Sequence, residues 1–279
     1  MDELKNIQNI IGMESLKKTL LIQIMYYLTD LNKDTDDYLH TILIGDPGCG
    51  KTTIAQYIGQ LYKKMGILAK DSSFTIAKRE DFIGEYLGST TTKTKKLLNS
   101  CIGGVLFIDE AYALGPGQKD KDSFSKEAID TLNVFLSEHK KDFCCIIAGY
   151  EEELQKCFFN VNKGLQRRFQ WTHKIESYTP DELALMLLQK INNIKWKTTL
   201  QFEYIRDQIK QNIHLFKFMG GDIEKLITTL KMNHSIRVFS LDEKHRKIIN
   251  KDDFDKSIKQ LNKSNPKKVV PVSIQYLYS

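Results

Sequence analysis

The residues with the most evident chemistry lie between Gly45 and Thr52, where the chain reads GDPGCGKT. Glycines at this spacing let backbone N–H groups curl around a phosphate, and a helix that starts after them adds its positive end. Lys51 can reach the β- and γ-phosphates of a nucleotide, and the Thr52 hydroxyl can bind Mg²⁺. We therefore expect ATP and Mg²⁺ here. The residues expected to contact the nucleotide are Asp46, Pro47, Gly48, Cys49, Gly50, Lys51, Thr52 and Thr53.

A second chemical cluster ends the apolar run 105–108, where Asp109 and Glu110 follow VLFI. The apolar run predicts a buried strand whose carboxyl end carries both acids. Asp109 is placed to enter the coordination shell of Mg²⁺, and Glu110 to polarise a water for attack on the γ-phosphate. A kinase of small molecules has no need of Glu110. The pair therefore predicts hydrolysis of ATP to ADP and phosphate.

Alternating strands and helices are expected to position these clusters. Short apolar runs predict strands over 40–45, 73–77, 105–109, 143–149 and 171–175. Amphipathic or turn-bounded segments between them predict helices over 14–31, 51–66, 91–101 and 126–139, with another after residue 149. This alternation indicates an α/β fold with a parallel sheet.

The pattern changes after Pro180. Helices are expected over 180–192, 199–213 and 221–234 with no strong strand between them, and the last residues read as an extended arm. The expected division is an α/β nucleotide-binding domain over 1–176, a helical lid domain over 177–264 and a C-terminal tail over 265–279.

Composition excludes several classes of protein. With 279 residues, of which 41% are hydrophobic, the chain can bury a core. Its five cysteines include no CxxC pair, which disfavours a disulfide framework or a zinc site. The apolar run 20–27 is interrupted by Gln23 and is far shorter than the roughly 20 residues that span a bilayer. No signal-peptide core is recognisable, so we expect a soluble, cytoplasmic protein without a membrane partner.

The charge is uneven along the chain. Residues 190–279 carry 18 Lys and Arg against 9 Asp and Glu, whereas residues 1–189 carry 23 against 26. A basic C-terminal third is compatible with nucleic-acid binding. Because its lysines alternate with acids and form no long block, a solvated helical surface is the favoured interpretation.

The order of the motifs resembles that of AAA+ ATPases, and in particular of the CfxQ group, which includes red-type Rubisco activases and sporulation-protein-like ATPases. The matching stretches are IIGMESLKK (10–18), LIGDPGCGKTTIA (43–55), REDFIGEYLGSTTTKTKKLL (79–98), GGVLFIDEAYAL (103–114), EAIDTLNVFL (127–136), IIAGYEEEL (146–154), GLQRRF (164–169) and YTPDEL (178–183). The resemblance implies a P-loop AAA+ domain with a five-stranded parallel sheet in order 5-1-4-3-2, a small helical lid, and a homohexameric ring that remodels a client protein.

The resemblance also implies roles for two groups outside the phosphate loop. The first group matches the segment that lines the adenine pocket: Ile10, Ile11 and Gly12. The second matches the central pore loop, in which an aromatic residue grips an extended polypeptide: Tyr86, Leu87 and Gly88.

Two further positions gain roles in catalysis from the same resemblance. Tyr150 stands where many AAA+ proteins have a polar sensor of the γ-phosphate, although simple packing accounts for it equally well. Arg168, rather than Arg167, matches the arginine finger that reaches the γ-phosphate of a neighbouring subunit. A finger acting in trans makes oligomerisation part of the mechanism.

One departure from the family pattern leaves alternatives open. The lid arginine of many members is replaced here by Ile223, so either Lys225 substitutes for it or the lid is weakly coupled to the γ-phosphate. The missing arginine suggests a nucleotide-switched scaffold, against which Lys51, Glu110 and Arg168 argue. The basic C-terminal third suggests a loader or helicase acting on nucleic acid, against which the Tyr-Leu-Gly loop argues.

Overall fold

The computed structural model describes residues 7–29, 31, 35, 37–86, 88–116, 122–243 and 246–265. The chain divides into two compact units, Met1–Ser177 and Tyr178–Ser279, which are described separately below. From residue 266 onwards, the tail expected over 265–279 lies outside the described residues. None of the described helices combines the length and apolar character needed to cross a bilayer.

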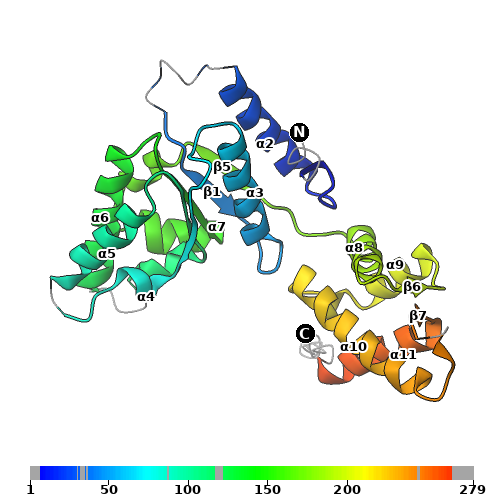
Figure 1. Ribbon diagram of the computed structural model, residues 1–279. Helices are drawn as coiled ribbons and strands as arrows, with labels where there is room; N and C mark the ends of the chain where they lie inside the picture. Colours follow the sequence, from blue (N-terminus) through cyan, green and yellow to red (C-terminus); the bar gives the residue numbers. More distant parts are fainter. Residues whose placement is uncertain are drawn as a thin grey trace, which may run out of the picture. The chain divides into compact units, whose positions relative to one another are not determined.

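Five parallel strands form the centre of the first unit (Figure 1). They are β1 (Thr41–Ile44), β2 (Phe74–Ala77), β3 (Val105–Ile108), β4 (Cys144–Gly149) and β5 (Trp171–Lys174). Their order is β2-β3-β4-β1-β5, which confirms the predicted order read from the other edge. Every residue of β3 and β4 is buried, as continuous apolar runs predict for strands covered on both faces. The carboxyl ends of β1, β3 and β4 therefore bring the phosphate loop, Asp109 and Tyr150 to one edge of the sheet.

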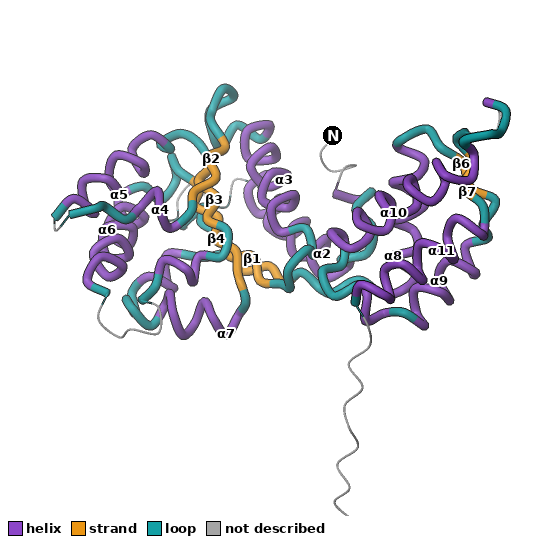
Figure 2. Tube along the Cα trace, turned by 90° about the horizontal axis from the view of Figure 1, so that it is seen from below, coloured by secondary structure: helices purple, strands orange, loops and turns teal. Residues whose placement is uncertain are grey.

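Helices cover both faces of this sheet (Figure 2). They are α2 (Glu14–Leu28), α3 (Lys51–Lys64), α4 (Arg79–Phe82), α5 (Ser89–Ser100), α6 (Ser123–Glu138) and α7 (Glu151–Glu153). Leu106 and Ile108 share a core cluster with Ala128 and Leu132 of α6. On the opposite face, Gly59 of α3 lies close enough to β3 that an added Cβ would be 3.1 Å from Val105 Cγ2.

Three irregular helical segments connect the strands to the site. They are the 3₁₀ turn η1 (Ala111–Leu114), the π-helix η2 (Leu154–Phe159) and the 3₁₀ turn η3 (Leu165–Arg168). The sequence predicts a helix after β4; the structure starts it as α7 and then widens it into η2. Gly115 approaches this segment so closely that a Cβ there would lie 1.7 Å from the Cys157 carbonyl oxygen.

The second unit is helical, with α8 (Pro180–Asn193), α9 (Phe202–Gln211), η4 (Ile213–Leu215), α10 (Gly220–Val238) and α11 (Lys251–Ser264). A capping box between Thr179 and Glu182 starts α8, with Pro180 in its first turn. Sequence reasoning missed α11, although Phe254, Ile258 and Leu261 stand at helical spacing in the otherwise polar segment KDDFDKSIKQLNKS. It also missed β6 (Lys197–Thr198) and β7 (Ile248–Ile249), which pair in parallel but are too short to leave a pattern.

A buried ionic cluster joins α10 to α11. Asp253 is 1% exposed and accepts from Arg237 Nε (2.8 Å) and Arg237 Nη2 (2.9 Å). His234 Nδ1 lies 3.0 Å from the same carboxylate. Charge-assisted bonds of this kind are stronger than neutral ones, so the cluster fixes α11, which has few apolar anchors of its own.

Candidate nucleotide site

The phosphate loop follows β1 and has a backbone that only glycine accepts easily. Gly48 and Gly50 have φ angles of 74° and 94°, in the left-handed region. At Gly45 there is no room for a side chain, because a Cβ would lie 2.8 Å from Cys49 Sγ and 3.0 Å from the Ile175 carbonyl oxygen. The Cys49 side chain is buried, so this residue can serve a nucleotide only through its backbone.

Lys51 opens α3 and turns back over the loop. Its Nζ donates to the carbonyl oxygens of Gly45 (3.0 Å) and Asp46 (2.9 Å). The same amine lies 5.7 Å from the ring centre of Tyr150. The Asp46 carboxylate accepts from the Ser177 hydroxyl at 2.7 Å. The Lys51 amine thus lies between the phosphate loop and Tyr150, the residue that follows β4.

Asp109 and Glu110 lie where β3 ends, as predicted. Burial raises the pKa of the Asp109 carboxyl, and the positive charge of Lys51 works in the opposite direction. Glu110 has φ 50° and ψ 48°, and its N–H donates to Asp109 Oδ1 at 3.0 Å. A left-handed backbone costs a residue other than glycine roughly 1–2 kcal/mol, so the surrounding structure must hold Glu110 in place.

Two tyrosines border these carboxylates, and sequence reasoning assigned a role to only one of them. The rings of Tyr112 and Tyr150 are 5.9 Å apart. Burial, and then the charge of Glu110, raise the pKa of Tyr112 to about 12, and Tyr112 also hydrogen-bonds to Glu110. The same two causes raise the pKa of Tyr150. Both rings line a cavity of about 620 Å³ together with Glu151, Glu152 and Glu153. Nothing in the sequence marks Tyr112, which is one aromatic residue among the apolar residues after the acids.

The oxygen donors of the site suit Mg²⁺. Thr52 lies in the first turn of α3, and Asp109 interacts with the neighbouring Lys51. Hydroxyl and carboxylate oxygens are the ligands that Mg²⁺ prefers. Among the described residues no group of three or more His, Cys, Asp or Glu could hold a metal by itself. One or two protein ligands, completed by phosphate oxygens, is the usual arrangement for Mg²⁺ at a nucleotide.

The residues expected at the adenine pocket lie before α2. Ile10, Ile11 and Gly12 are half-buried in the turn that enters this helix. Gly12 and Met13 both have positive φ angles, 66° and 58°. Helix entry accounts for this geometry, and the adenine role stays a prediction.

Tyr86 stands out from the loop that joins α4 to α5. Its side chain is 75% exposed, so the ring is open to solvent. Ser89 fixes the turn, because its hydroxyl donates to the Tyr86 carbonyl oxygen at 2.7 Å and accepts from the Tyr86 N–H at 3.1 Å. Gly88 has φ 81°. Leu87 lies outside the described residues.

Arg168 ends η3, three residues before β5 begins. Its Nε donates to the Ser137 hydroxyl at 2.7 Å, and its guanidinium lies 6.0 Å from the ring centre of Tyr38. Tyr38 precedes β1, so Arg168 lies at the amino ends of the strands. Lys51 lies at their carboxyl ends. Arg167 beside it is exposed.

In the second unit, the position of the missing lid arginine is occupied by a core residue. Ile223 is fully buried in α10. Lys225 pairs with Asp222 at 2.9 Å, and its amine lies 5.4 Å from the ring centre of Phe218. Substitution by Lys225 and weak coupling of the lid both stay predictions.

Comparison with known proteins agrees with this geometry. Residues 41–175 match the family described as "ATPase family associated with various cellular activities (AAA)". Stage V sporulation protein K of Bacillus subtilis is 34% identical over 230 residues, which cover 78% of this chain and 69% of that protein. The chain belongs to the AAA family, in its CfxQ group. It is therefore a nucleotide-binding ATPase, and the resemblance stated from its motifs is confirmed.

Other relatives place it in the same group. A putative cfxQ-like protein of Acanthamoeba polyphaga mimivirus is 40% identical over 238 residues, covering 85% of this chain and 58% of that protein. The chain thus spans little more than half of this relative. A chloroplastic ribulose bisphosphate carboxylase/oxygenase activase of Cyanidioschyzon merolae is 32% identical over 208 residues, covering 74% of this chain and 67% of that protein.

Solved structures at low sequence identity show the fold alone. A RuvB mutant of Thermotoga maritima gives a TM-score of 0.65 at 18% identity, covering 92% of this chain and 72% of the other. The FIGL-1 AAA domain in complex with ADP gives 0.64 at 18% identity, covering 91% and 83%.

Proposed function

We propose that this AAA ATPase is a protein-remodelling motor that works as a ring, built of six copies as its family resemblance implies. The observation that carries the proposal is the separation of Arg168 from Lys51 along the strands. An arginine at the amino ends of the strands is poorly placed to serve a phosphate at their carboxyl ends. It is well placed to serve the site of a neighbouring copy.

Within one site, each residue has a distinct task. The glycine backbone and Lys51 bind the β- and γ-phosphates. Thr52 and Asp109 provide oxygens that would hold Mg²⁺, which, when bound, neutralises phosphate charge. Glu110 accepts a hydrogen bond from the attacking water and orients it toward the γ-phosphate. Tyr150, whose ring lies beside the Lys51 amine, contacts the γ-phosphate and responds to its loss on hydrolysis.

The neighbouring copy completes the site. The guanidinium of its Arg168 stabilises the negative charge that develops on the phosphoryl oxygens in the transition state. Its contacts with Ser137 and Tyr38 hold the guanidinium in place in the free chain. Hydrolysis then depends on assembly, so the rate per subunit rises with protein concentration.

Exposed Tyr86 supports a polypeptide as the client. A flexible chain can stack against an aromatic ring whatever its sequence, and Gly88 permits the tight turn behind the ring. The relative from Cyanidioschyzon merolae is named as an activase of an enzyme, which is consistent with a protein client.

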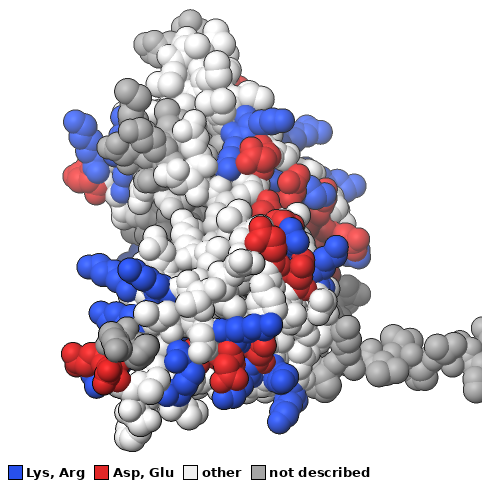
Figure 3. All heavy atoms as spheres, turned by 90° about the vertical axis from the view of Figure 1, so that its right-hand side faces the viewer, with Lys and Arg blue, Asp and Glu red and all other residues white. Residues whose placement is uncertain are grey.

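A motor on nucleic acid remains the second candidate, motivated by the basic C-terminal third. On the face shown in Figure 3, basic and acidic side chains lie interspersed, which disfavours a continuous phosphate-binding stripe. Salt-sensitive DNA binding that raises the ATPase rate would favour this candidate over a protein client.

The test compares ATPase turnover with protein concentration for the wild type, Glu110→Gln and Arg168→Ala, with Arg167→Ala as the matched control. We expect both substitutions to abolish turnover, while the control stays active. Mixing the two inactive variants in equal amounts should restore up to about a quarter of the wild-type rate, because one interface in four pairs an intact Glu110 with an intact Arg168. No restored activity, or hydrolysis by a monomer, would favour a nucleotide-switched scaffold.

A further inference from the structure

Arg79 occupies a position between the exposed loop and the catalytic acids. It is the first residue of α4, which leads into the loop that carries Tyr86. Its Nη1 lies within hydrogen-bond distance of three backbone carbonyl oxygens, which share its two N–H groups: those of Ala113 (2.8 Å), Leu114 (3.1 Å) and Gly115 (3.0 Å). These carbonyls end η1, the turn that begins directly after Glu110. The last carbonyls of a helical turn lack partners within it, and a cation there is favoured.

A second set of contacts anchors the same guanidinium. Its Nη1 also donates to the Ser125 hydroxyl at 2.8 Å, and its Nη2 pairs with the Asp122 carboxylate. Asp122 is the N-cap of α6 and accepts from the N–H groups of Phe124 (3.1 Å) and Ser125 (3.2 Å). Burial acts to raise the pKa of Asp122, but the bonds from Ser125 and Arg79 hold it below its ordinary value. Contacts with both α6 and η1 therefore hold the Arg79 guanidinium in place.

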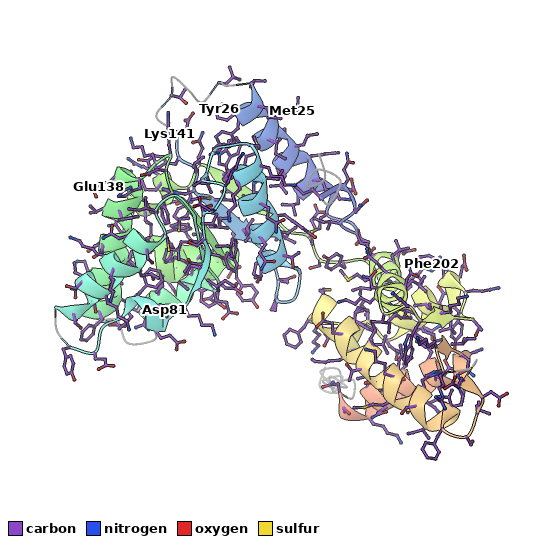
Figure 4. The ribbon with its side chains drawn as sticks, viewed as in Figure 1. Met25, Tyr26, Asp81, Glu138, Lys141 and Phe202 are labelled. Atoms are coloured by element: carbon purple, nitrogen blue, oxygen red, sulfur yellow. The ribbon has the colours of Figure 1, made fainter. Side chains whose placement is uncertain are left out.

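The helix that bears Arg79 is tied to the base of the exposed loop. Asp81, labelled in Figure 4, caps α4 by accepting from the Lys78 N–H at 2.8 Å. Lys93 of α5 donates to the carbonyl oxygens of Glu80 (2.7 Å) and Ile83 (3.0 Å). These contacts hold α4 against α5, on either side of the loop that carries Tyr86, and Arg79 connects α4 to η1.

We propose that Arg79 is a positioning residue that holds Glu110 in its left-handed conformation and passes movement of the loop around Tyr86 to it. A strained backbone persists only where its surroundings over-determine it. The turn that follows Glu110 has only four residues, so the guanidinium on its last carbonyls is a principal restraint. The coupling to the loop rests on the proposed client, and the positioning rests on the proposed task of Glu110 in hydrolysis.

The test compares Arg79→Gln and Arg79→Lys with the wild type. Arg206→Gln is the matched control, because that arginine makes a solvent-accessible pair with Asp207 in the other unit. Three quantities are measured: the Kd for a fluorescent ATP analogue, kcat and KM for ATP, and the ratio of rates with and without a permanently unfolded polypeptide such as carboxymethylated lactalbumin.

For Arg79→Gln we expect kcat to fall about tenfold, the Kd to stay within about twofold, and the rate ratio to approach one. Arg79→Lys should recover only part of kcat, because one ammonium cannot bond three carbonyls and two side chains at once. The control should match the wild type. If Arg79→Gln does not fold, Asp122→Asn serves instead, with an intermediate loss of kcat at unchanged Kd.

Unchanged kcat and unchanged rate ratio in these variants would overturn the inference, as would a fall in kcat matched by an equal loss of nucleotide affinity. If the wild type itself is not stimulated by the polypeptide, the proposed client fails. A selective fall in kcat in Arg79→Gln would still support the positioning of Glu110.

Discussion

Because the first unit buries two neutral imidazoles, those of His40 and His173, we expect its free energy of unfolding to fall as the pH drops from 7.5 to 5.5. His40, just before β1, is fully buried, and this burial lowers its pKa to about 4. Its Nδ1 accepts from the Cys145 N–H at 3.2 Å, so its Nε2 carries the proton and donates to the Leu136 carbonyl oxygen at 3.2 Å. The neutral ring is satisfied, whereas a second proton would face the Cys145 N–H.

His173 in β5 has the same property. It is 1% exposed, and burial lowers its pKa to about 4. Its ring nitrogens lie 2.8 Å from Thr19 Oγ1 and 2.7 Å from Gln23 Oε1, both on α2. The ring therefore joins the helix to the sheet in its neutral form.

The expected magnitude follows from the difference between folded and unfolded pKa values. In the unfolded chain both rings titrate near 6.5, so below that pH the unfolded state binds more protons and is favoured. The two neutral rings contribute fully to the free energy of unfolding above pH 6.5, and this contribution is lost as the pH falls toward 4. Each ring removes about 1.4 kcal/mol per pH unit in this window, so both together remove about 2.7 kcal/mol at pH 5.5. This is a large part of the roughly 5–15 kcal/mol that stabilises a domain.

Urea unfolding of the full chain at pH 7.5 and 5.5 measures this loss. Trp171 in β5 reports the first unit, and Trp196→Phe removes the tryptophan of the second. His40→Gln should halve the pH dependence of the free energy of unfolding, because it removes one of the two rings. Most carboxylates titrate below this window. A loss under about 1 kcal/mol in the Trp196→Phe background, or an unaltered slope in His40→Gln, would refute the reasoning.

Three further outcomes are expected. Chelation by EDTA should stop ATP turnover and excess Mg²⁺ should restore it, as followed by phosphate release; full activity in EDTA would contradict the assigned ligands. Asp253→Ala should destabilise the second unit by about 3 kcal/mol in urea unfolding, because it leaves Arg237 without its buried partner, while Asp252→Ala at an exposed pair should cost under about 0.5 kcal/mol. Gly45→Ala should cost about 1–3 kcal/mol and weaken ATP binding, since the added Cβ meets Cys49; wild-type affinity in a calorimetric titration would show that the loop has room.

The parts of the fold and site that could be predicted are those encoded in continuous segments. The phosphate loop is eight consecutive residues flanked by a strand and a helix, so residue type, spacing and context all point to one chemistry. The strand ending in Asp109 and Glu110 is equally local. The sheet order came from the family resemblance rather than from periodicity, which predicts strands but not their neighbours.

The parts that could not be predicted depend on contacts between distant segments. Arg79 reads as an ordinary charged residue before a short helix, and its partners lie 34 to 46 residues further along the chain. The left-handed conformation of Glu110 leaves no mark in the residue type, because glutamate is normally found elsewhere in φ/ψ space. Buried His234 is paired with Asp253, which lies 19 residues further along the chain on another helix.

The π-helix η2 has a consequence for the orientation of the chain that follows it. The Asn160 N–H donates to the Gln155 carbonyl oxygen at 3.1 Å, a five-residue loop that holds one residue more than an α-helical turn. Deleting a single residue here would let an ordinary helix form and would rotate the following chain by roughly 100°. The extra residue thus sets the direction in which the chain leaves η2. In η2 a deletion or an insertion is therefore expected to disturb the structure more than a substitution does.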